Sequence, residues 1–496
     1  MQQAISLIII KILIEQFKGK KLSDSNLIMK IITRREENIM TAKQKQVQKS
    51  RVLDMTKGSP MRLLLLFSIP LFVGNLLQQF YNLADTSIAG HVLGDAALAQ
   101  IGATSALYSL ITNFAFGLNN GLALNVSRQF GAGDEGKMRR SVCWMVTLSL
   151  ASALVMTAIS LVSRDLMADF LQIPIETRDG ALDYLTVILA GIPFTMVYNM
   201  ESALLQAVGN SVTPLLLLFF SSVLNIGLDF LFMGPLELGV KGAASATVLA
   251  QAISAVLGFV YIAREYPQLR FGKKEWETEH SFVFEMLKNG LSMALMSAIY
   301  NIGSVVLQSS INALGSVYIA AQTGGRRLAE LFYVPGLALG TSAATYSSQN
   351  FGAGKGKRIK MGMRTAMFLY GIWWIIAVIF VFTAAPAAVK LLTGSTEKEV
   401  IRCAVQYLRI SIPMIPPMAF LVIVRNVLQG MGYAFWPLFC SALELIGKII
   451  FALWIVPLVG YWAVCVCEPV TWVICAIVIA FGMQAYRSQF KDKEEI

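Results

Sequence analysis

The strongest constraint on this chain is a series of long apolar blocks, each close to the length of a membrane-spanning helix. A helix needs about 20 mainly apolar residues to cross the ~30 Å hydrocarbon layer, and isolated irregular backbone cannot cross it. Hydrophobic residues make up 56% of the 496 residues and charged residues only 14%, against about 25% charged residues in soluble domains. We therefore predict an all-α membrane protein with 12 transmembrane helices near residues 61–83, 98–123, 142–161, 182–207, 214–233, 243–262, 286–311, 319–344, 365–391, 410–427, 437–456 and 463–483.

The basic residues predict how these helices are oriented. Roughly fifteen Lys and Arg residues fall at the loops on one side of the predicted helices, and roughly seven fall on the other side. The excess of positive charge on cytoplasmic loops places both termini in the cytoplasm, in a multi-pass protein of the bacterial plasma membrane. The net charge of +11 is then explained by contact with acidic membrane lipids, and we expect no nucleic-acid partner.

Two pairs of matching segments reveal an internal duplication. "SRQFGAGDEGKMRR" from Ser127 resembles "SQNFGAGKGKRIK" from Ser348, and "LLQAVGNSVTP" from Leu204 resembles "VLQGMGYAFWP" from Val427. The offsets are 221 and 223 residues, so each copy would contain six helices. An even number of helices returns the chain to its starting side, which predicts two parallel six-helix repeats, an arrangement found in transporters.

The first of these segments also resembles a nucleotide-binding P-loop. Gly131, Gly136 and Lys137 have the spacing of G-x-x-x-x-G-K-[ST], but Met138 replaces the hydroxyl that should hold magnesium. The second copy breaks the spacing, and each copy follows a predicted membrane helix instead of a strand. We therefore interpret both copies as turns between helices, and we expect no use of ATP.

Ionisable side chains inside apolar blocks are the candidates for function, because a lone charge at mid-membrane costs ~2.5–3.5 kcal/mol on insertion scales. Asp85 ends the first block, Asp229 lies late in the fifth, and Asn225 precedes Asp229 by four residues on the same helical face. The first and fifth helices run outward and the sixth returns, which places Thr247 about 6 Å below the start of the sixth helix. All four residues are thus predicted at a similar depth.

Such an all-oxygen set suits a hard cation such as Na⁺, and a pair of carboxyl groups at one apolar site also suits protons. We therefore predict that Asp85, Asn225, Asp229 and Thr247 bind Na⁺ or H⁺. Alternatives remain for each of them. Asn225 and Asp229 could form a structural hydrogen-bonded pair, Asp85 could face water at a helix end, and Thr247 could bond its own backbone.

Pro70, fifteen residues before Asp85, is expected to break and kink the first helix. One hypothesis is that a cation at Asp85 favours either a straight or a bent form of this helix, and the alternative is a passive kink. Polar residues of the first helix, and two that match them in the second repeat, are candidates to line a central cavity: Gln78, Gln79, Tyr81, Asn82, Tyr300 and Asn301.

The second repeat lacks the acidic set of the first. Ser304, Lys448 and Ala452 stand opposite Asp85, Asn225 and Asp229, which argues against a second sodium site. Other charged residues lie inside its apolar blocks: Arg326, Arg327, Glu330, Glu444, Lys448 and Glu468. They form either a buried charge network or, for Glu330, Glu444 and Glu468, direct contacts with substrate. Glu201 in the fourth block has no obvious partner.

Two longer stretches, together with the "FGAG" turns, also carry a family resemblance. "FSIPLFVGNLLQQFYNLADTSIAGHVLG" from Phe67 and "NIGLDFLFMGPLELGVKGAASAT" from Asn225 resemble the multidrug and toxin extrusion (MATE) transporters. The resemblance implies a V of two six-helix lobes around a central cavity, and antiport of substrate against Na⁺ or H⁺. It also implies that Asp85, Asn225, Asp229 and Thr247 match the cation site of the family's N-terminal lobe.

These observations predict a secondary active transporter that exports amphipathic, often cationic, drug-like compounds as a monomer, without a cofactor. Its expected parts are an extension at 1–58, an N-lobe at 59–264, a linker at 265–285, a C-lobe at 286–486 and a tail at 487–496. The extension would be an interfacial helix or a disordered tail, with Met55 a plausible true start. The alternatives are a lipid-linked oligosaccharide flippase of the same superfamily and, less compatible with the duplication, an ion channel. No nucleophile–base set or metal-ligand cluster suggests an enzyme.

Overall fold

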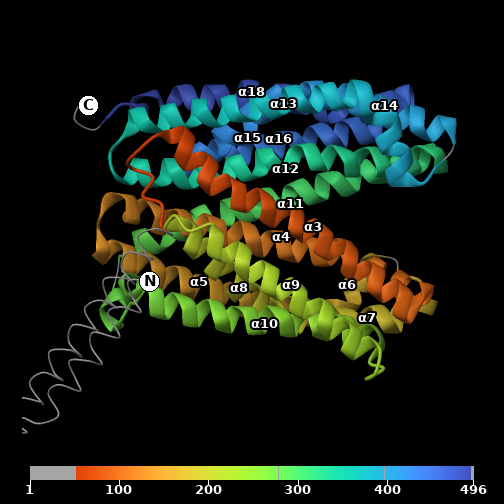
Figure 1. Ribbon diagram of the computed structural model, residues 1–496, viewed down its shortest axis with the longest axis horizontal. Helices are drawn as coiled ribbons and strands as arrows, with labels where there is room; N and C mark the ends of the chain where they lie inside the picture. Colours follow the sequence, from red (N-terminus) through yellow and green to blue (C-terminus); the bar gives the residue numbers. More distant parts are fainter. Residues whose placement is uncertain (1–51, 172, 278, 396, 493–496) are drawn as a thin grey trace, which may run out of the picture. The chain divides into compact units, whose positions relative to one another are not determined.

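The computed structural model describes residues 52–171, 173–277, 279–395 and 397–492, and these residues are mostly helical (Figure 1). Residues 1–51 of the expected N-terminal extension lie outside this part. The helices of the first half are α3 (Pro60–Leu93), α4 (Asp95–Ala132), α5 (Glu135–Val162), α6 (Arg164–Phe170), α7 (Ile175–Ala190), α8 (Ile192–Ala207), α9 (Val212–Met233) and α10 (Gly239–Glu265). Those of the second half are α11 (His280–Leu314), α12 (Ser316–Gly352), α13 (Gly356–Thr393), α14 (Lys398–Ser411), α15 (Ile415–Gly430), α16 (Phe435–Ile450), α17 (Val456–Val459) and α18 (Tyr461–Ala485).

Each of the twelve apolar blocks is found inside one of these helices or a pair of them. In the part of the chain that is described, ten helical segments are long and apolar enough to cross a membrane. The pair α7 and α8 makes an eleventh, bent by 47° at Gly191. The twelfth is α12, whose 37 residues are long enough, but Arg326, Arg327 and Glu330 make it less apolar than the others.

Several helices extend beyond the blocks that predicted them. α3 runs without a break from Pro60 to Leu93, so Pro70 does not end it and Asp85 lies inside the helix instead of at its end. Proline removes one backbone hydrogen bond, and a membrane helix tolerates this loss when neighbouring helices pack around it. α3 has such neighbours, because it packs against α9 on one side and α12 and α13 on the other.

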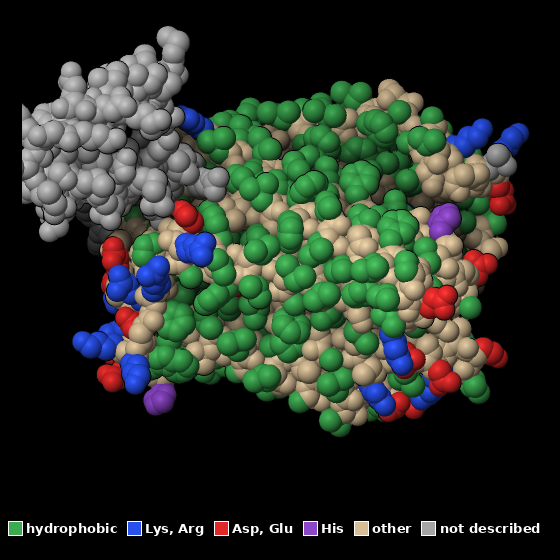
Figure 2. Space-filling view, turned by 60° about the horizontal axis from the view of Figure 1, so that its bottom comes forward, with side chains coloured by type: hydrophobic (Ala, Val, Ile, Leu, Met, Phe, Trp, Pro, Cys, Tyr) green, Lys and Arg blue, Asp and Glu red, His purple; other side chains and the backbone are tan. Residues whose placement is uncertain are grey.

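The outer surface is that of a membrane protein. Figure 2 shows apolar side chains over the middle of the visible face, with charged side chains gathered at its two ends. Large apolar residues are exposed on helices of both halves, among them Leu154, Phe259, Ile379 and Phe481. Exposure of so much apolar surface is unfavourable in water and favourable in lipid.

The two halves join at the end of the bundle that carries the two FGAG turns, which we call the FGAG end. There α4 packs against α11 and α12 with almost no space between the backbones. A Cβ atom on Gly131 would lie 2.0 Å from the carbonyl oxygen of Gln349, and one on Gly352 would lie 1.9 Å from that of Arg128. Gly352 is the repeat counterpart of Gly131, and Gln349 is the counterpart of Arg128, each at an offset of 221 residues. The two contacts are therefore equivalent, and an approximate twofold axis relates the two turns.

The second glycine of each FGAG turn ends the preceding helix. Gly133 and Gly354 have φ angles of 71° and 72°, a left-handed conformation that glycine adopts at little cost and that ends a helix. Asp134 then caps α5 by accepting a hydrogen bond from the backbone N–H of Lys137 at 2.9 Å. As the sequence predicts, the P-loop lookalike is a turn between two helices.

A short segment before α3 is bound to both halves at the same end. The N–H of Leu53 donates to the carbonyl of Gly209 at 3.1 Å, and the N–H of Met55 donates to Oε1 of Gln349 at 2.9 Å. Met55 is fully buried. Leu53 and Met55, which fall within the expected extension of 1–58, therefore pack against the helices of both halves. Likewise α11 begins at His280, inside the expected linker of 265–285.

Candidate functional site

Two acidic side chains from different helices meet inside the first half. The carboxyl groups of Asp85 on α3 and Asp229 on α9 lie within hydrogen-bonding reach of each other. With its amide turned to satisfy both polar atoms, Asn225 donates to Oδ2 of Asp229 at 2.9 Å and accepts from the backbone N–H of Thr247 at 3.1 Å. The structure thus brings together Asp85, Asn225, Asp229 and Thr247, the four residues selected from the sequence.

A shell of neutral hydrogen-bonding groups surrounds these carboxyl groups. The Tyr81 hydroxyl bonds to the side chain of Thr247, and the Tyr108 hydroxyl bonds to Gln251 on α10. Thr195 on α8 donates to Oε1 of Gln251 at 2.5 Å. The sequence analysis did not identify Tyr108, Thr195 or Gln251, because a neutral polar residue on a membrane helix gives no signal that distinguishes it from its neighbours.

The acidic pair has free capacity to bind a small cation. Asp229 is fully buried, and the Oδ1 atoms of Asp85 and Asp229 have no hydrogen-bond partner among the described residues. Two carboxylates in contact repel one another unless a proton or a cation lies between them. This arrangement can therefore exchange one positive ion for another, because either a proton or a hard metal cation removes the repulsion.

A cavity of about 710 Å³ lies between the two halves. The residues that line it from the first half are uncharged, and its polar groups there are mainly amides: Asn75, Gln79, Asn113, Asn120 and Gln206. The charged groups of its wall all come from the second half: Glu330, Arg425, Glu444, Lys448 and Glu468. Aromatic rings of Tyr300, Tyr333 and Trp472 complete that wall.

The expected cavity residues are only partly correct. Tyr300, Asn301 and Gln79 line the cavity, whereas Gln78, Tyr81 and Asn82 do not. Gln78 is rotated by about 100° from Gln79 on the helix, and its amide donates to Oδ1 of Asn82 at 3.1 Å. Tyr81 instead faces the acidic pair and Thr247.

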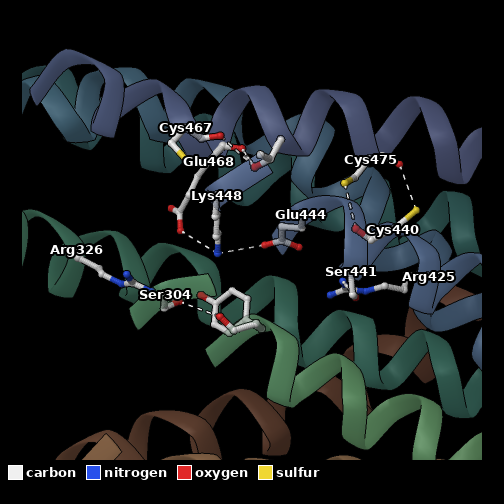
Figure 3. Close-up of polar contacts among 12 residues, drawn as sticks. Ser304, Arg326, Arg425, Cys440, Ser441, Glu444, Lys448, Cys467, Glu468 and Cys475 are labelled. Carbon is white, nitrogen blue, oxygen red and sulfur yellow. Dashed lines mark hydrogen bonds and ion pairs between the residues drawn. The ribbon is translucent and has the colours of Figure 1, made fainter. Parts of the chain in front are cut away.

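The charged residues of the second half meet around Lys448. Figure 3 shows its ammonium between two carboxylates, with Nζ 3.4 Å from Oε1 of Glu444 and 3.8 Å from Oε1 of Glu468. Tyr407 donates to the second oxygen of Glu468 at 3.2 Å. Arg326 forms a separate ion pair with Glu330 at 3.3 Å and donates to Oγ of Ser304 at 3.1 Å.

Two charged residues differ from the expectation, and a third, Glu201, lacks a partner as the sequence indicated. Arg327 is exposed and forms no ion pair within the described ranges, because it points about 100° away from Arg326. Arg425 lines the cavity and was not selected from the sequence, although it lies inside the tenth apolar block, at 410–427. Glu201 is buried, and both of its carboxyl oxygens lack a partner among the described residues.

Comparisons with known proteins agree with this arrangement. A family model described as MatE matches the chain twice, over residues 70–231 and 292–454, in the two halves of the duplication. "Probable multidrug resistance protein YpnP" of Bacillus subtilis is 30% identical over 311 residues, covering 62% of this chain and 69% of that protein. "Probable multidrug resistance protein YoeA" of the same organism is 24% identical over 407 residues, covering 80% and 86%.

The solved structures support the fold. One described as the outward-facing conformation of a multidrug resistance MATE family transporter matches with a TM-score of 0.80 at 22% identity, covering 88% of this chain and 98% of that one. A second, described as MATE in the bent conformation, matches with a TM-score of 0.81 at 23% identity, covering 88% and 97%. The prediction of an all-α membrane protein built from two six-helix lobes is confirmed.

Proposed function

The chain belongs to the MatE family of multidrug efflux transporters, and on this premise we propose that it exports amphipathic organic cations by antiport with Na⁺ or H⁺. The observation that carries the proposal is the contact between the carboxyl groups of Asp85 and Asp229. Thr247 adds a neutral hydroxyl oxygen near that pair, and oxygen atoms are the ligands that hard cations prefer. Asn225 donates to Asp229 and holds it in place. The relatives whose names refer to multidrug resistance support the direction of transport.

We place the FGAG end in the cytoplasm of a bacterial plasma membrane, since the turns there are rich in Lys and Arg. The structure, in which the two halves meet at the FGAG end, would then be closed toward the cytoplasm. Helices α3 and α9 would carry Asp85 and Asp229 in the outer half of the membrane, where ions can enter from outside. Binding of Na⁺ or H⁺ there removes the repulsion between the carboxylates and alters how α3 packs, while cargo leaves the central cavity.

The composition of the cavity wall favours a cationic cargo over a lipid-linked pyrophosphate. Three carboxylates and two basic groups line it, so the wall carries an excess of negative charge. A flippase for a pyrophosphate-linked lipid needs several basic groups without competing acids. Small drug-like cations, without ATP or nucleic acid, are therefore the proposed partners of a monomeric transporter.

The experiment that tests this proposal is efflux of ethidium from proteoliposomes under a sodium gradient and, separately, under a proton gradient. Asp229→Asn keeps the size of the side chain and one acceptor oxygen and removes its charge. We expect this variant to lose efflux under whichever gradient drives the wild type, while it remains folded in detergent. Unchanged efflux by Asp229→Asn would show that the coupling ion binds elsewhere. Lys241→Ala, which changes an exposed ion pair with Asp183 (3.1 Å), is the control.

A further inference from the structure

Lys448 has an unusual environment for a lysine in the wall of a cavity. Its side chain is only 1% exposed, and its ammonium lies between Glu444 and Glu468 (Figure 3). The ring of Tyr300 covers it, with Nζ 4.6 Å from the ring centroid. Two carboxylates and an aromatic face are the groups that proteins use to bind an organic ammonium. Here the protein's own side chain occupies that position.

The ammonium is held by charge more than by directed hydrogen bonds. The distances of 3.4 and 3.8 Å exceed the 2.7–2.9 Å typical of a charge-assisted hydrogen bond. By geometric criteria, Nζ has no hydrogen-bond partner among the described residues, although it is buried. A lysine held in this way can leave the carboxylates without breaking well-aligned bonds, provided that another cation replaces its charge.

The internal duplication relates Lys448 to a residue of the cation site in the first half. By the repeat offset of 223, Lys448 stands where the first half has Asn225, which contacts the acidic pair. The first half thus has an acidic pair with free oxygen atoms, and the second has an acidic pair with a tethered cation. Lysine is also the basic residue that can lose its proton inside a protein, whereas arginine cannot.

We propose that Lys448 occupies the ammonium site of the cargo, and that a cationic substrate binds between Glu444 and Glu468 by displacing it. This inference rests on the proposed function and names the site of the cargo within it. The lysine ammonium releases one proton to water in the cavity and becomes a neutral amine as the substrate cation takes its place. One positive charge enters the site and one leaves, so the charge around the carboxylates is conserved.

The neighbouring groups are compatible with this exchange. Arg326 already has Glu330 as its ion-pair partner, and Arg425 lies 3.4 Å from Oγ of Ser441. Neither arginine forms an ion pair with Glu444 or Glu468 among the described residues, although Arg326 also lies in the electrostatic field of Glu468, so both carboxylates remain within reach of the substrate. The titratable and charged groups that act on Lys448 are Tyr300, Arg326, Cys467 and Glu468 from the surrounding helices and Glu444 on its own helix. Tyr407 contacts Glu468, and Arg425 lines the same cavity.

The test measures proton release when benzyltrimethylammonium binds to the full-length protein in detergent. This probe is a permanent cation, so every released proton comes from the protein. The measurement is made on Asp85→Asn/Asp229→Asn protein, in which the acidic pair of the first half has no carboxyl group left to release a proton. We expect release of about one proton per probe bound near pH 8, and affinity that increases with pH. Binding without proton release would overturn the inference.

Lys448→Met provides the second arm. Without the competing ammonium, we expect the probe to bind at least ~10-fold more tightly at pH 8. Lys448→Met/Glu444→Gln, which removes both the ammonium and the second carboxylate that could share a proton with Glu468, should release no proton and also serves if the single variant folds poorly. Lys241→Met is the matched control and should behave as the parent protein. Unchanged affinity and proton release in Lys448→Met would refute the exchange.

These outcomes are separable from those of the efflux experiment. If ion-driven efflux is unchanged in Asp229→Asn, the proposed coupling site is wrong, and the binding measurements at Lys448 remain valid. Loss of proton-linked binding at Lys448, with efflux still driven by an ion gradient, would remove only the inferred cargo site.

Discussion

The contact between the two FGAG turns leads to a quantitative prediction about the transport cycle. Gly131→Ala places a methyl group 2.0 Å from the carbonyl oxygen of Gln349, and Gly352→Ala places one 1.9 Å from that of Arg128. The closest comfortable contact is about 3.4 Å, so the backbones must separate by roughly 1.4 Å. Overpacking of this kind costs about 1–3 kcal/mol. Only the state closed at the FGAG end bears this cost, since the contact is absent once the halves part there.

A cost of this size changes the ratio of closed to open molecules about 5- to 150-fold. Spin labels at cysteines replacing Arg140 on α5 and Lys360 on α13, both exposed at the FGAG end, report the separation of the halves by double electron–electron resonance. All six native cysteines are buried, which favours specific labelling. We expect either alanine substitution to shift the distance distribution toward the longer, open population.

The matched control is Gly102→Ala, on the same helix as Gly131. A Cβ at Gly102 would have nothing within 4 Å, so alanine there should stabilise α4 by up to ~1 kcal/mol and leave the distances unchanged. The reasoning is refuted if Gly131→Ala and Gly352→Ala give the distance distribution of the parent protein. It is also refuted if Gly102→Ala opens the FGAG end to the same extent.

Three further predictions concern single polar residues. Lys137→Ala should leave efflux intact, because Lys137 is largely exposed and its only ion pair in the described chain is with Asp134 at 3.5 Å; a folded but inactive variant would contradict this. Asp134→Ala should lower the thermal midpoint in detergent, since a lost helix cap costs about 0.5–2 kcal/mol. The hydrogen bond from the backbone N–H of Lys137 holds the pKa of the Asp134 carboxyl below its usual range. The cap therefore stabilises the fold at neutral pH, and this contribution is lost as the pH falls through the lowered pKa. Glu201→Gln should raise thermal stability at pH 8, because it removes a buried carboxyl group without partners; loss of proton-driven efflux in this variant would instead identify Glu201 as part of a proton path.

The sequence predicts well those features that depend on one helix or one pair of helices. Apolar length identifies the helices, and the cost of a charge in lipid selects Asp85 and Asp229. The spacing of four residues then brings Asn225 to the same face as Asp229. These arguments succeed because every segment that crosses the hydrocarbon layer must pair its own backbone polar groups, which requires a helix with mainly apolar side chains.

Features that depend on rotation about a helix axis were not predictable in the same way. Gln78 and Gln79 are neighbours, yet only Gln79 lines the cavity, because the packing of α3 against α9 and α12 determines which side turns inward. The same argument separates Arg326 from Arg327. Helix ends were also misjudged, since α3 continues past Asp85 to Leu93 through a segment that mixes polar and apolar residues.

The crossed contact of the FGAG turns also suggests how such a chain could arise. In a dimer of identical six-helix chains, one two-fold axis would make the glycine of each subunit touch the same carbonyl group of its partner. A single substitution would then alter both contacts together. Once the two copies are joined in one chain, Gly131 and Gly352 can change independently, and an ancestral symmetric interface becomes free to evolve different walls, neutral on one side of the cavity and charged on the other.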